Sequence, residues 1–416
     1  MKIAEMRVTE VAISDPPLLN AAGLHAHYAL RTIVELITDD GLYGLGEVPG
    51  GAGVTGALEA CQKSIIGHDP FQLNAIKAAV TQTVTDPKHL TRVFSAIEVA
   101  CFDLMGKATG RPVVDLLGGK ARDSVDFSAY LFYKYEGAGG ELGFDTDPDA
   151  TGWAAARQAE ALDAVGVVAQ AKAMCKAYGF KSIKLKGGAL PPEEEVEAMF
   201  ALRDAFGPDT PLRLDPNAIW SYETALKWGK ELLGVLEYYE DPVRGQADMA
   251  RLRQALDIPL ATNMCTTSFD HIPKAISLGS EDVILSDHHA WGGLQATVHM
   301  ARICQTFGRG VSMHSNSHLG ISLAAMVHVA AALPNLDYAC DTHYPWQSEE
   351  VLTRGRFEFE NGSLAVPEGP GLGIELDRDA LVALHESYLT VGISERDDEL
   401  AMQAKQPGWA FQAQRW

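Results

Sequence analysis

Polar residues end a series of short β-rich runs along the second half of the chain. The runs FKSIKLK, PLRLD, LEYYE, IPLATN, EDVILSD, GVSMH and LDYACD lead to Lys186, Asp215, Glu240, Asn263, Asp287, His314 and Asp341. Asp215, Glu240 and Asn263 end three consecutive runs and offer carboxylate and amide oxygens. Such hard donors suit Mg²⁺ far better than Zn²⁺, which prefers His and Cys. We therefore expect a magnesium site on these three residues, with N-capping of the following helices as the alternative.

Two lysines lie in the first of these runs. Lys184 and Lys186 flank Leu185, and a spacing of two places both ammonium groups on one face of a strand. Charged groups that point into a barrel are costly unless they have a function. Two close ammonium groups lower each other's pKa, which is how a lysine becomes a base near neutral pH. The pair is predicted to supply a base, and solvated lysines on an edge strand are the alternative.

A second candidate base lies further round the series. Asp287 and His314 end neighbouring runs, and a carboxylate that holds one imidazole nitrogen leaves the other free as an acid or base. A structural histidine is the alternative. With Lys186 and His314 on opposite sides of a metal, the arrangement suits removal of a proton next to a carboxylate. Mg²⁺ and an ammonium group would then stabilise the enediolate.

The spacing of the runs predicts the elements that position these residues. Successive ends lie between 23 residues (240 to 263) and 29 residues (186 to 215) apart, which accommodates a strand, a helix and two short loops. Strand and helix alternation at this pitch is typical of parallel βαβ units, and seven or eight in a row favour a (β/α) barrel. The carboxyl ends of barrel strands share one rim, where active sites lie.

The first part of the chain has a different pattern. Two strands are expected at 6–13 and 29–37, and Asp39, Asp40 and Gly41 predict a hairpin turn into LYGLGEV. Helical periodicity follows from 55 to 119, with a helix at 95–110 that ends on a glycine C-cap. We predict an α+β domain at 1–130, a barrel domain at 131–368, and a segment at 369–416 that packs back on the first domain.

Composition narrows the class of protein. The chain has 34 Lys and Arg against 55 Asp and Glu, so its formal charge of −21 argues against a nucleic-acid-binding surface and an anionic membrane face. Six cysteines without a CxxC pair predict reduced thiols and a cytoplasmic setting. MKIAEMRVTEVAIS has no signal-peptide pattern, and the apolar stretch at 321–333 is shorter than the roughly 20 residues that span a bilayer.

Together, these motifs resemble the enolase superfamily, and within it the glucarate dehydratase group. The resemblance rests on KLK at 184–186, DPN at 215–217, EDP at 240–242, ATNM at 261–264, Asp287 and HSN at 314–316. It extends over nearly the whole chain through LLNAAGLHAHY, GLGEVPGG, AYLFY, DTHYPWQ and PGWAFQAQR. ATNM is the most specific motif, because most members of the superfamily use Asp or Glu as the third metal ligand.

The resemblance implies an α+β capping domain, completed by the C-terminal tail, on a (β/α)₇β barrel. It implies Mg²⁺ on Asp215, Glu240 and Asn263, with Lys186 and His314 as opposed bases. Asp287 would orient His314, while Lys184 and Asn217 would stabilise the intermediate. The positions that match the group's substrate contacts are Asn20, His25, Ser95, Tyr130, Phe132, Asn316, His343 and Arg415. Arg415 would hold the distal carboxylate, and each of these side chains has a structural alternative.

The implied reaction is Mg²⁺-dependent dehydration of an acid sugar, an aldarate such as D-glucarate, to a 2-keto-3-deoxy acid. The expected partners are this small molecule and, in a homo-oligomer, further copies of the chain. Ser317-His318-Leu319-Gly320 and Ser95 depart from the group's pattern, and the stretch after Pro242 is shorter. These changes affect the pocket wall and leave the sugar open. An epimerase or racemase, another acid-sugar dehydratase, and a non-catalytic acid-binding relative are the alternatives.

Overall fold

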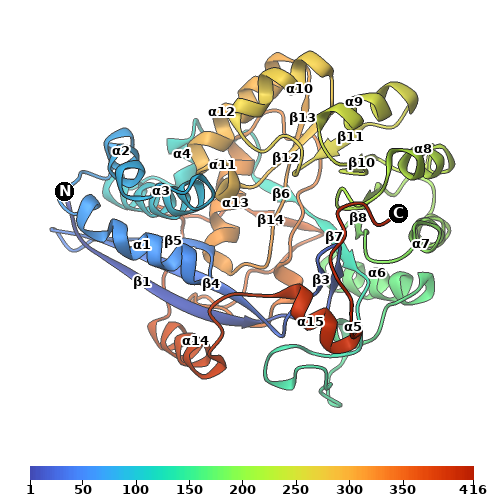
Figure 1. The fold of residues 1–416 in the computed structure, drawn as a ribbon. Helices are drawn as coiled ribbons and strands as arrows, with labels where there is room; N and C mark the ends of the chain where they lie inside the picture. The colour runs from blue at the N-terminus through green and yellow to red at the C-terminus, as the bar shows by residue number, and fades with distance from the viewer.

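The computed structural model describes residues 1–416, and a parallel barrel forms its centre (Figure 1). Its strands are hydrogen-bonded in the order β13-β12-β11-β10-β9-β8-β7. Their bounds are β7 Ser128–Phe132, β8 Ser182–Lys186, β9 Leu212–Asp215, β10 Tyr238–Glu240, β11 Leu260–Thr262, β12 Val283–Ser286 and β13 Gly310–Met313. The helices between them are α5 Gly152–Gln158, α6 Ala164–Tyr178, α7 Pro192–Phe206, α8 Tyr222–Glu231, α9 Gln246–Ala255, α10 Ile272–Leu278, α11 His288–Trp291, α12 Leu294–Thr306 and α13 Gly320–Ala332.

An irregular segment takes the eighth strand position. Residues 336–341 make parallel bridges to both edges of the sheet, Val311 to Leu336 and Phe127 to Cys340. The Asp341 N–H donates to Met313 O at 2.9 Å, and the Ser128 N–H donates to Cys340 O at 2.9 Å. This segment closes the sheet after seven strand–helix units, so the predicted (β/α)₇β architecture is confirmed.

The strands end close to the predicted residues. β8, β9 and β10 end at Lys186, Asp215 and Glu240, whereas β11, β12 and β13 each end one residue before Asn263, Asp287 and His314. The carboxyl ends of parallel strands face the same side of a barrel. The polar residues therefore meet at one rim, either on the last residue of a strand or on the first residue of the following loop.

The N-terminal unit is a three-stranded antiparallel sheet with helices. It comprises β1 Ile3–Ser14, β2 Leu19–Asn20, β3 Gly23–Leu24, β4 Tyr28–Thr38, β5 Tyr43–Pro49, α1 Ala52–Ile65, α2 Leu73–Thr83, α3 Pro87–Thr109 and α4 Val113–Leu116. The hairpin predicted between 29–37 and LYGLGEV joins β4 to β5. The predicted helix at 95–110 is the second part of α3, whose true start is set by the Asp86 N-cap and by Pro87.

The C-terminal segment packs on this unit. The short β6 Ser124–Asp126 and β14 Ser363–Ala365 pair with each other, and the last helices are α14 Arg378–Val391 and α15 Asp398–Lys405. Figure 1 shows α14 beside β1 and α15 beside β3. Arg378 Nη2 lies 2.7 Å from Glu35 Oε2 in β4. The segment thus completes the capping unit, while the boundaries at 130 and 368 stay predictions.

A buried carboxylate joins the cap to the barrel. Glu47 of β5 accepts hydrogen bonds from Arg31 Nε at 2.6 Å, the Leu319 N–H at 2.8 Å and the Ser322 N–H at 2.8 Å. Burial raises the pKa of Glu47, but these partners lower it, and the net pKa lies below the usual value. The contact fixes the cap over the strand ends, because Leu319 and Ser322 lie at the start of α13. No helix of the chain is both long enough and apolar enough to cross a membrane.

Candidate active site

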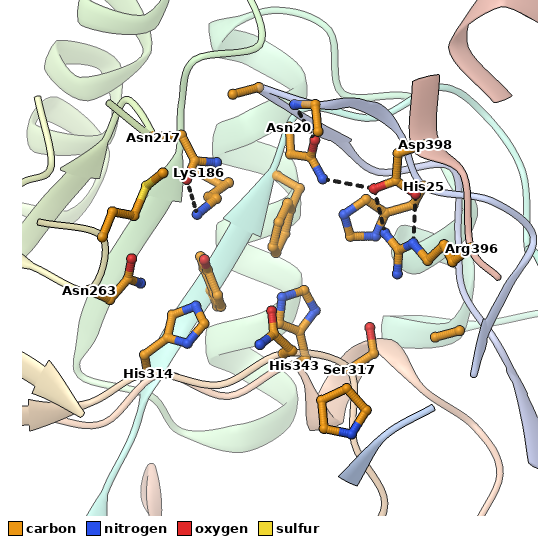
Figure 2. Close-up of a pocket in the computed structure, with 18 of the residues that line it drawn as sticks. Asn20, His25, Lys186, Asn217, Asn263, His314, Ser317, His343, Arg396 and Asp398 are labelled. Carbon is orange, nitrogen blue, oxygen red and sulfur yellow. Dashed lines mark hydrogen bonds and ion pairs between the residues drawn. The ribbon is translucent and has the colours of Figure 1, made fainter. Parts of the chain in front are cut away.

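A cavity of about 530 Å³ lies between the barrel rim and the cap (Figure 2). Its wall combines residues of the barrel, the N-terminal unit and the C-terminal segment. The predicted site residues that line it are Asn20, His25, Tyr130, Phe132, Lys186, Asn217, Asn263, His314, Asn316 and His343. Lys184, Asp215, Glu240 and Asp287 lie behind this surface, each buried. Ser95 and Arg415 are absent from the wall.

The floor behind Lys186 is a buried cluster of lysines and carboxylates. Lys184 Nζ lies 2.6 Å from Glu240 Oε2, 2.7 Å from Asp341 Oδ2 and 3.7 Å from Asp215 Oδ2. Lys186 Nζ lies 2.6 Å from Asp215 Oδ2 and donates to Asn217 Oδ1 at 3.0 Å. Asp341 ends the last of the β-rich runs, but its sequence position alone does not reveal its contact with Lys184.

Carboxylates dominate the electrostatics of this floor. Burial lowers the pKa of Lys186, but Asp215, Tyr130 and Glu240 together raise it more, and the net pKa lies above the usual value. Burial likewise lowers the pKa of Lys184, but Asp341 and Glu240 raise it, and the net pKa lies well above its usual value. The prediction that the two ammonium groups leave a lysine with a lowered pKa is therefore wrong in this structure. Lys184 does lower the pKa of Lys186, but the nearby carboxylates outweigh it.

The donor set fits a hard divalent cation. Asp215, Glu240 and Asp341 carry three negative charges against two on the lysines, so one negative charge is left over when all are ionised. Burial, followed by Asp215, raises the pKa of Glu240 well above its usual value. Glu240 Oε2 is buried without a hydrogen bond, because Lys184 Nζ is close but lies outside hydrogen-bond geometry. Adding positive charge would relieve this carboxylate.

None of the three predicted metal ligands caps a helix. α8 begins after Ser221, whose side chain accepts from the Thr224 N–H, and α9 begins after Gly245. Asn263 Nδ2 instead donates to Glu240 Oε1 at 3.1 Å, which brings the amide next to the carboxylate. The N-capping alternative therefore fails for these residues, and their side chains converge at the rim.

The loops that carry these donors hold strained backbone. Asn217, Ala218 and Asp241 have φ of 60°, 57° and 35°, in the left-handed region that non-glycine residues seldom adopt. The carboxylate of Asp241 accepts from the Asn263 N–H at 2.8 Å and the Met264 N–H at 3.1 Å. Burial raises the pKa of Asp241 to about 6. Backbone strain of this kind persists where the surrounding structure fixes it, and it positions Asn217 and Asn263 at the cavity wall.

His314 faces the cavity from the side opposite Lys186 in the view of Figure 2. Its Nδ1 lies 3.4 Å from Asp287 Oδ2, and Asn316 Nδ2 lies 3.4 Å from the same oxygen. The closer partner of Asp287 is His289, whose Nδ1 lies 2.8 Å from Oδ1. Burial raises the pKa of Asp287, but His289 and His314 lower it, and the net pKa lies well below the usual value. Asp287 also caps α11, so the capping alternative applies to this residue alongside its contact with His314.

Asp287, His288 and His289 form a second group of possible metal ligands. Asp287 and His289 already have other partners, however, whereas His288 Nε2 is buried without one. Asp287 Oδ1 accepts from the His289 N–H at 2.9 Å, and His289 Nε2 lies 3.0 Å from Ser322 Oγ. Burial lowers the pKa of His288 well below its usual value. We interpret this group as a hydrogen-bond network that orients Asp287, a role that the sequence pattern did not assign to His289.

The far wall of the cavity comes from the N-terminal unit and the C-terminal segment. Arg396 Nε and Nη2 donate to the two oxygens of Asp398 at 2.6 and 2.9 Å, and Asn20 Nδ2 donates to Asp398 Oδ2 at 3.2 Å. Arg396 Nη1 also donates to Asp15 Oδ2 at 2.9 Å, and His25 Nδ1 lies 3.1 Å from the same atom. Arg396 and Asp398 were not predicted, because ERDDEL reads only as a run of surface charge.

Two arginines line the cavity without a charged partner. Arg92 lies in α3, one turn before Ser95, and Arg244 follows β10, and neither forms an ion pair or a side-chain hydrogen bond. Arg415 instead donates to Ala21 O at 3.0 Å and Gly188 O at 3.4 Å. Ser95 is buried within α3, and its Oγ has no partner. The unpaired positive charge of the cavity thus comes from Arg92 and Arg244.

Known proteins resemble the chain over its whole length. The family model for the mandelate racemase and muconate lactonizing enzyme N-terminal domain matches residues 3–118, and the enolase C-terminal domain-like model matches residues 166–380. A probable glucarate dehydratase of Streptomyces coelicolor is 46% identical, covering 98% of this chain and 97% of its own.

Solved structures agree with these matches. An enolase of Thermobispora bispora complexed with magnesium and formate is 50% identical over the full length of both chains, with a TM-score of 0.94. A Pseudomonas fluorescens enolase with bound magnesium, potassium and tartrate is 47% identical, with a TM-score of 0.93, covering 100% of this chain and 99% of its own.

Proposed function

Since the chain belongs to the enolase superfamily, we propose that it is a Mg²⁺-dependent dehydratase of an acid sugar, most specifically of an aldarate such as D-glucarate. The observation that carries the proposal is the presence of Lys186 and His314 in one cavity, above the carboxylates Asp215 and Glu240. The similarity to a probable glucarate dehydratase and the magnesium in solved relatives support it.

Asp215, Glu240 and Asn263 would hold the Mg²⁺. When bound, the ion supplies positive charge at the substrate carboxylate, where an enediolate develops negative charge. Lys184 adds a fixed ammonium group behind the same site, because it is fully buried and its pKa lies well above the usual value. This preorganised positive charge stabilises the intermediate more than the substrate, which is the condition for catalysis.

Lys186 is the group that we assign to proton removal. Its Nζ reaches the cavity and is held by Asp215 Oδ2 and Asn217 Oδ1. As the neutral amine, it would take the proton from the carbon next to the substrate carboxylate, leaving the electron pair in the enediolate. Asn217 keeps Nζ directed at the cavity through its hydrogen bond, so it acts as a positioning residue for the base.

His314 is the group that we assign to loss of the β-hydroxyl. Its Nδ1 faces Asp287, so Nε2 is the atom available to the substrate. The protonated imidazole would give its proton to the departing hydroxyl, the C–O bond would break, and water would leave. The resulting enol would then tautomerise to the 2-keto-3-deoxy acid, so atoms and charge balance without a further reactant.

The remaining wall fits the body of a polyhydroxy acid. Asn20, His25 and the Arg396–Asp398 pair offer donors and acceptors for hydroxyl groups, while Tyr130, Phe132 and His343 form an aromatic face. We assign the distal carboxylate to Arg92 and Arg244, because both guanidinium groups lack a counter-charge. Arg415, predicted for this role, donates to backbone carbonyls instead. A homo-oligomer stays a prediction.

The decisive experiment incubates the Mg²⁺-loaded enzyme with a panel of aldarates and sugar monoacids. Keto-acid formation is followed by the absorbance of the semicarbazone. We expect a semicarbazide-reactive product from at least one aldarate, and none after addition of a chelator. Isomerisation of the acids without a keto product would indicate an epimerase, and no change in any acid would overturn an enzymatic role.

A further inference from the structure

A second cavity, of about 610 Å³, lies apart from the catalytic one, and the two share no lining residue. Its wall is formed by the end of β1, the start of β4, residues 138–158, residues 345–356 and α14. Nothing in the proposed reaction uses this space. Two of its buried side chains, Gln347 and Arg157, have polar atoms without hydrogen-bond partners, which points to a ligand.

Gln347 is the clearest sign of a missing partner. The residue is 3% exposed and lines this cavity, yet neither its Nε2 nor its Oε1 has a hydrogen-bond partner. A buried amide whose donor and acceptor both lack hydrogen-bond partners destabilises the fold. Few buried polar groups in folded proteins are left in this state. A ligand that both accepts from Nε2 and donates to Oε1 would satisfy the side chain.

Two arginines line the same cavity without a carboxylate partner. Arg157 Nε donates to Trp346 O at 2.5 Å and Nη1 donates to Ala138 O at 3.2 Å, while Nη2 is buried and has no partner. Arg356 Nη2 and Nη1 donate to backbone carbonyls of residues 344 and 349. Burial lowers the pKa of Arg157, Glu349 and Asp15 raise it, and Arg356 lowers it, so that the net pKa lies below the usual value. The two positive charges are therefore anchored but not neutralised by direct ion pairs.

The acidic residues of this cavity form no ion pairs with Arg157 or Arg356. Glu141 and Asp147 are exposed, so water screens them. Glu349 accepts hydrogen bonds from the N–H and hydroxyl groups of Ser14 and Ser348, and it forms no ion pair with either arginine. The charge of Glu349 acts on Arg157 from across the cavity, but neither arginine forms a direct ion pair with a carboxylate of the chain.

We propose that this cavity is a second ligand site that binds a small hydroxy acid, with its carboxylate on Arg157 and Arg356 and a hydroxyl group on the amide of Gln347. Arg157 Nη2 and Gln347 Nε2 are the free donors, and Gln347 Oε1 is the free acceptor. Guanidinium groups bind carboxylates through paired N–H donors, so an arginine pair suits an acid better than a neutral sugar.

The site has a direct structural connection to the catalytic cavity. His343 lines the catalytic cavity and Gln347 lines the second one, and only the turn 344–346 separates them. Within that turn, Trp346 Nε1 donates to Tyr130 O at 2.8 Å, and Trp346 O accepts from Arg157. A hydroxy acid on Arg157 would therefore act on the segment that carries His343, and the tryptophan provides a fluorescence signal for binding.

The test titrates tartrate, as a hydroxy-acid probe, into the full chain in chelator, by calorimetry and tryptophan fluorescence. We expect binding by the wild type that Gln347→Leu and Arg157→Gln each weaken at least tenfold. Arg354→Gln is the matched control, because Arg354 is exposed and lies outside the cavity. Gln347→Leu should keep its thermal unfolding midpoint, since it removes two unpaired polar atoms. This keeps the test valid if Arg157→Gln fails to fold.

Two outcomes would overturn the proposal. One is the absence of tartrate binding to the chelator-treated wild type. The other is binding that survives Gln347→Leu but is lost in the double variant Arg92→Ala and Arg244→Ala, because that result would assign the tartrate to the catalytic cavity. The proposal is independent of the dehydratase reaction, which is tested by product formation and not by binding.

Discussion

Lys186 Nζ lies 2.6 Å from Asp215 Oδ2, so the side chain that we assign as the base is ion-paired with a side chain that we assign to the metal. The pair explains how a strongly acidic floor can be buried, because each charge compensates the other. It also means that a divalent cation and Lys186 compete for one carboxylate. Binding of the cation would weaken the hold of Asp215 on the lysine proton and so bring its pKa down.

Lys186→Ala should abolish turnover while leaving Mg²⁺ binding intact or tighter. Loss of a general base typically lowers the rate by about 10²–10⁴-fold, and loss of the ammonium group leaves Asp215 free for the cation. Steady-state rates and calorimetric titration with Mg²⁺ measure the two effects. Retained turnover would remove Lys186 from the mechanism, and weaker Mg²⁺ binding would mean that the lysine helps to build the metal site.

His314→Ala should also abolish dehydration, while His289→Ala should lower it less and shift its pH dependence. His289 lies closer to Asp287 than His314 does, and it acts only through that carboxylate. Rate–pH profiles of the wild type and both variants would separate the roles. A His289 variant with an unchanged profile would show that His289 only supports the packing of α11.

Asn263→Ala should weaken Mg²⁺ binding, because it removes one of the three oxygen donors at the rim. Calorimetric titration gives the affinity directly, and we expect a decrease of about tenfold or more. Asn20→Ala is the matched control, since Asn20 lies on the far wall and contacts Asp398. Equal Mg²⁺ affinity in the Asn263 variant and the control would place the metal elsewhere.

Arg92→Ala and Arg244→Ala should raise KM for an aldarate much more than for a sugar monoacid, because only the diacid has a distal carboxylate. A charged hydrogen bond contributes roughly 1.5–3 kcal/mol, which corresponds to about a 10- to 100-fold change. Arg415→Ala is the comparison variant and should affect both acids equally. If only Arg415→Ala raises KM more for the aldarate than for the monoacid, Arg415 and not the two cavity arginines binds the distal carboxylate.

Protonation of His328 should destabilise the fold as the pH falls. His328 is buried in α13, where Nδ1 accepts from the Val114 N–H at 3.2 Å and Nε2 lies 3.1 Å from Leu372 O. Burial lowers its pKa to about 4, against about 6.5 when unfolded, so the unfolded chain binds the extra proton first. Stability that is present above pH 6.5 is then lost between about pH 6.5 and 4.

Protonation of His328 should lower the free energy of unfolding of the wild type by about 2 kcal/mol when the pH falls from 7 to 5. Urea denaturation at the two pH values measures the loss, and His328→Asn should lose correspondingly less, because asparagine does not titrate. The same loss in both proteins would show that His328 does not contribute to the pH dependence.

Local patterns in the sequence determined the elements and most of the rim. The regular spacing of β-rich runs predicts parallel strands, and each strand ends at or one residue before the polar residue that follows its apolar stretch. Such patterns depend on residues a few positions apart, where alternation and capping act. Lys186, Asp215, Glu240, Asn263 and His314 are therefore placed correctly at the rim without coordinates.

Only the tertiary structure decided which groups far apart in the sequence form ion pairs. Asp341 pairs with Lys184 across 157 positions, and Arg396 reaches Asp15 across 381. Burial and Lys184 lower the pKa of Lys186, and its net rise depends on how close Asp215, Tyr130 and Glu240 lie to it. Arg92 and not Arg415 lines the cavity because α3 packs against the rim, while the tail is held by backbone carbonyls. Electrostatic contacts of this kind depend on separation in space, which the order of residues along the chain does not specify.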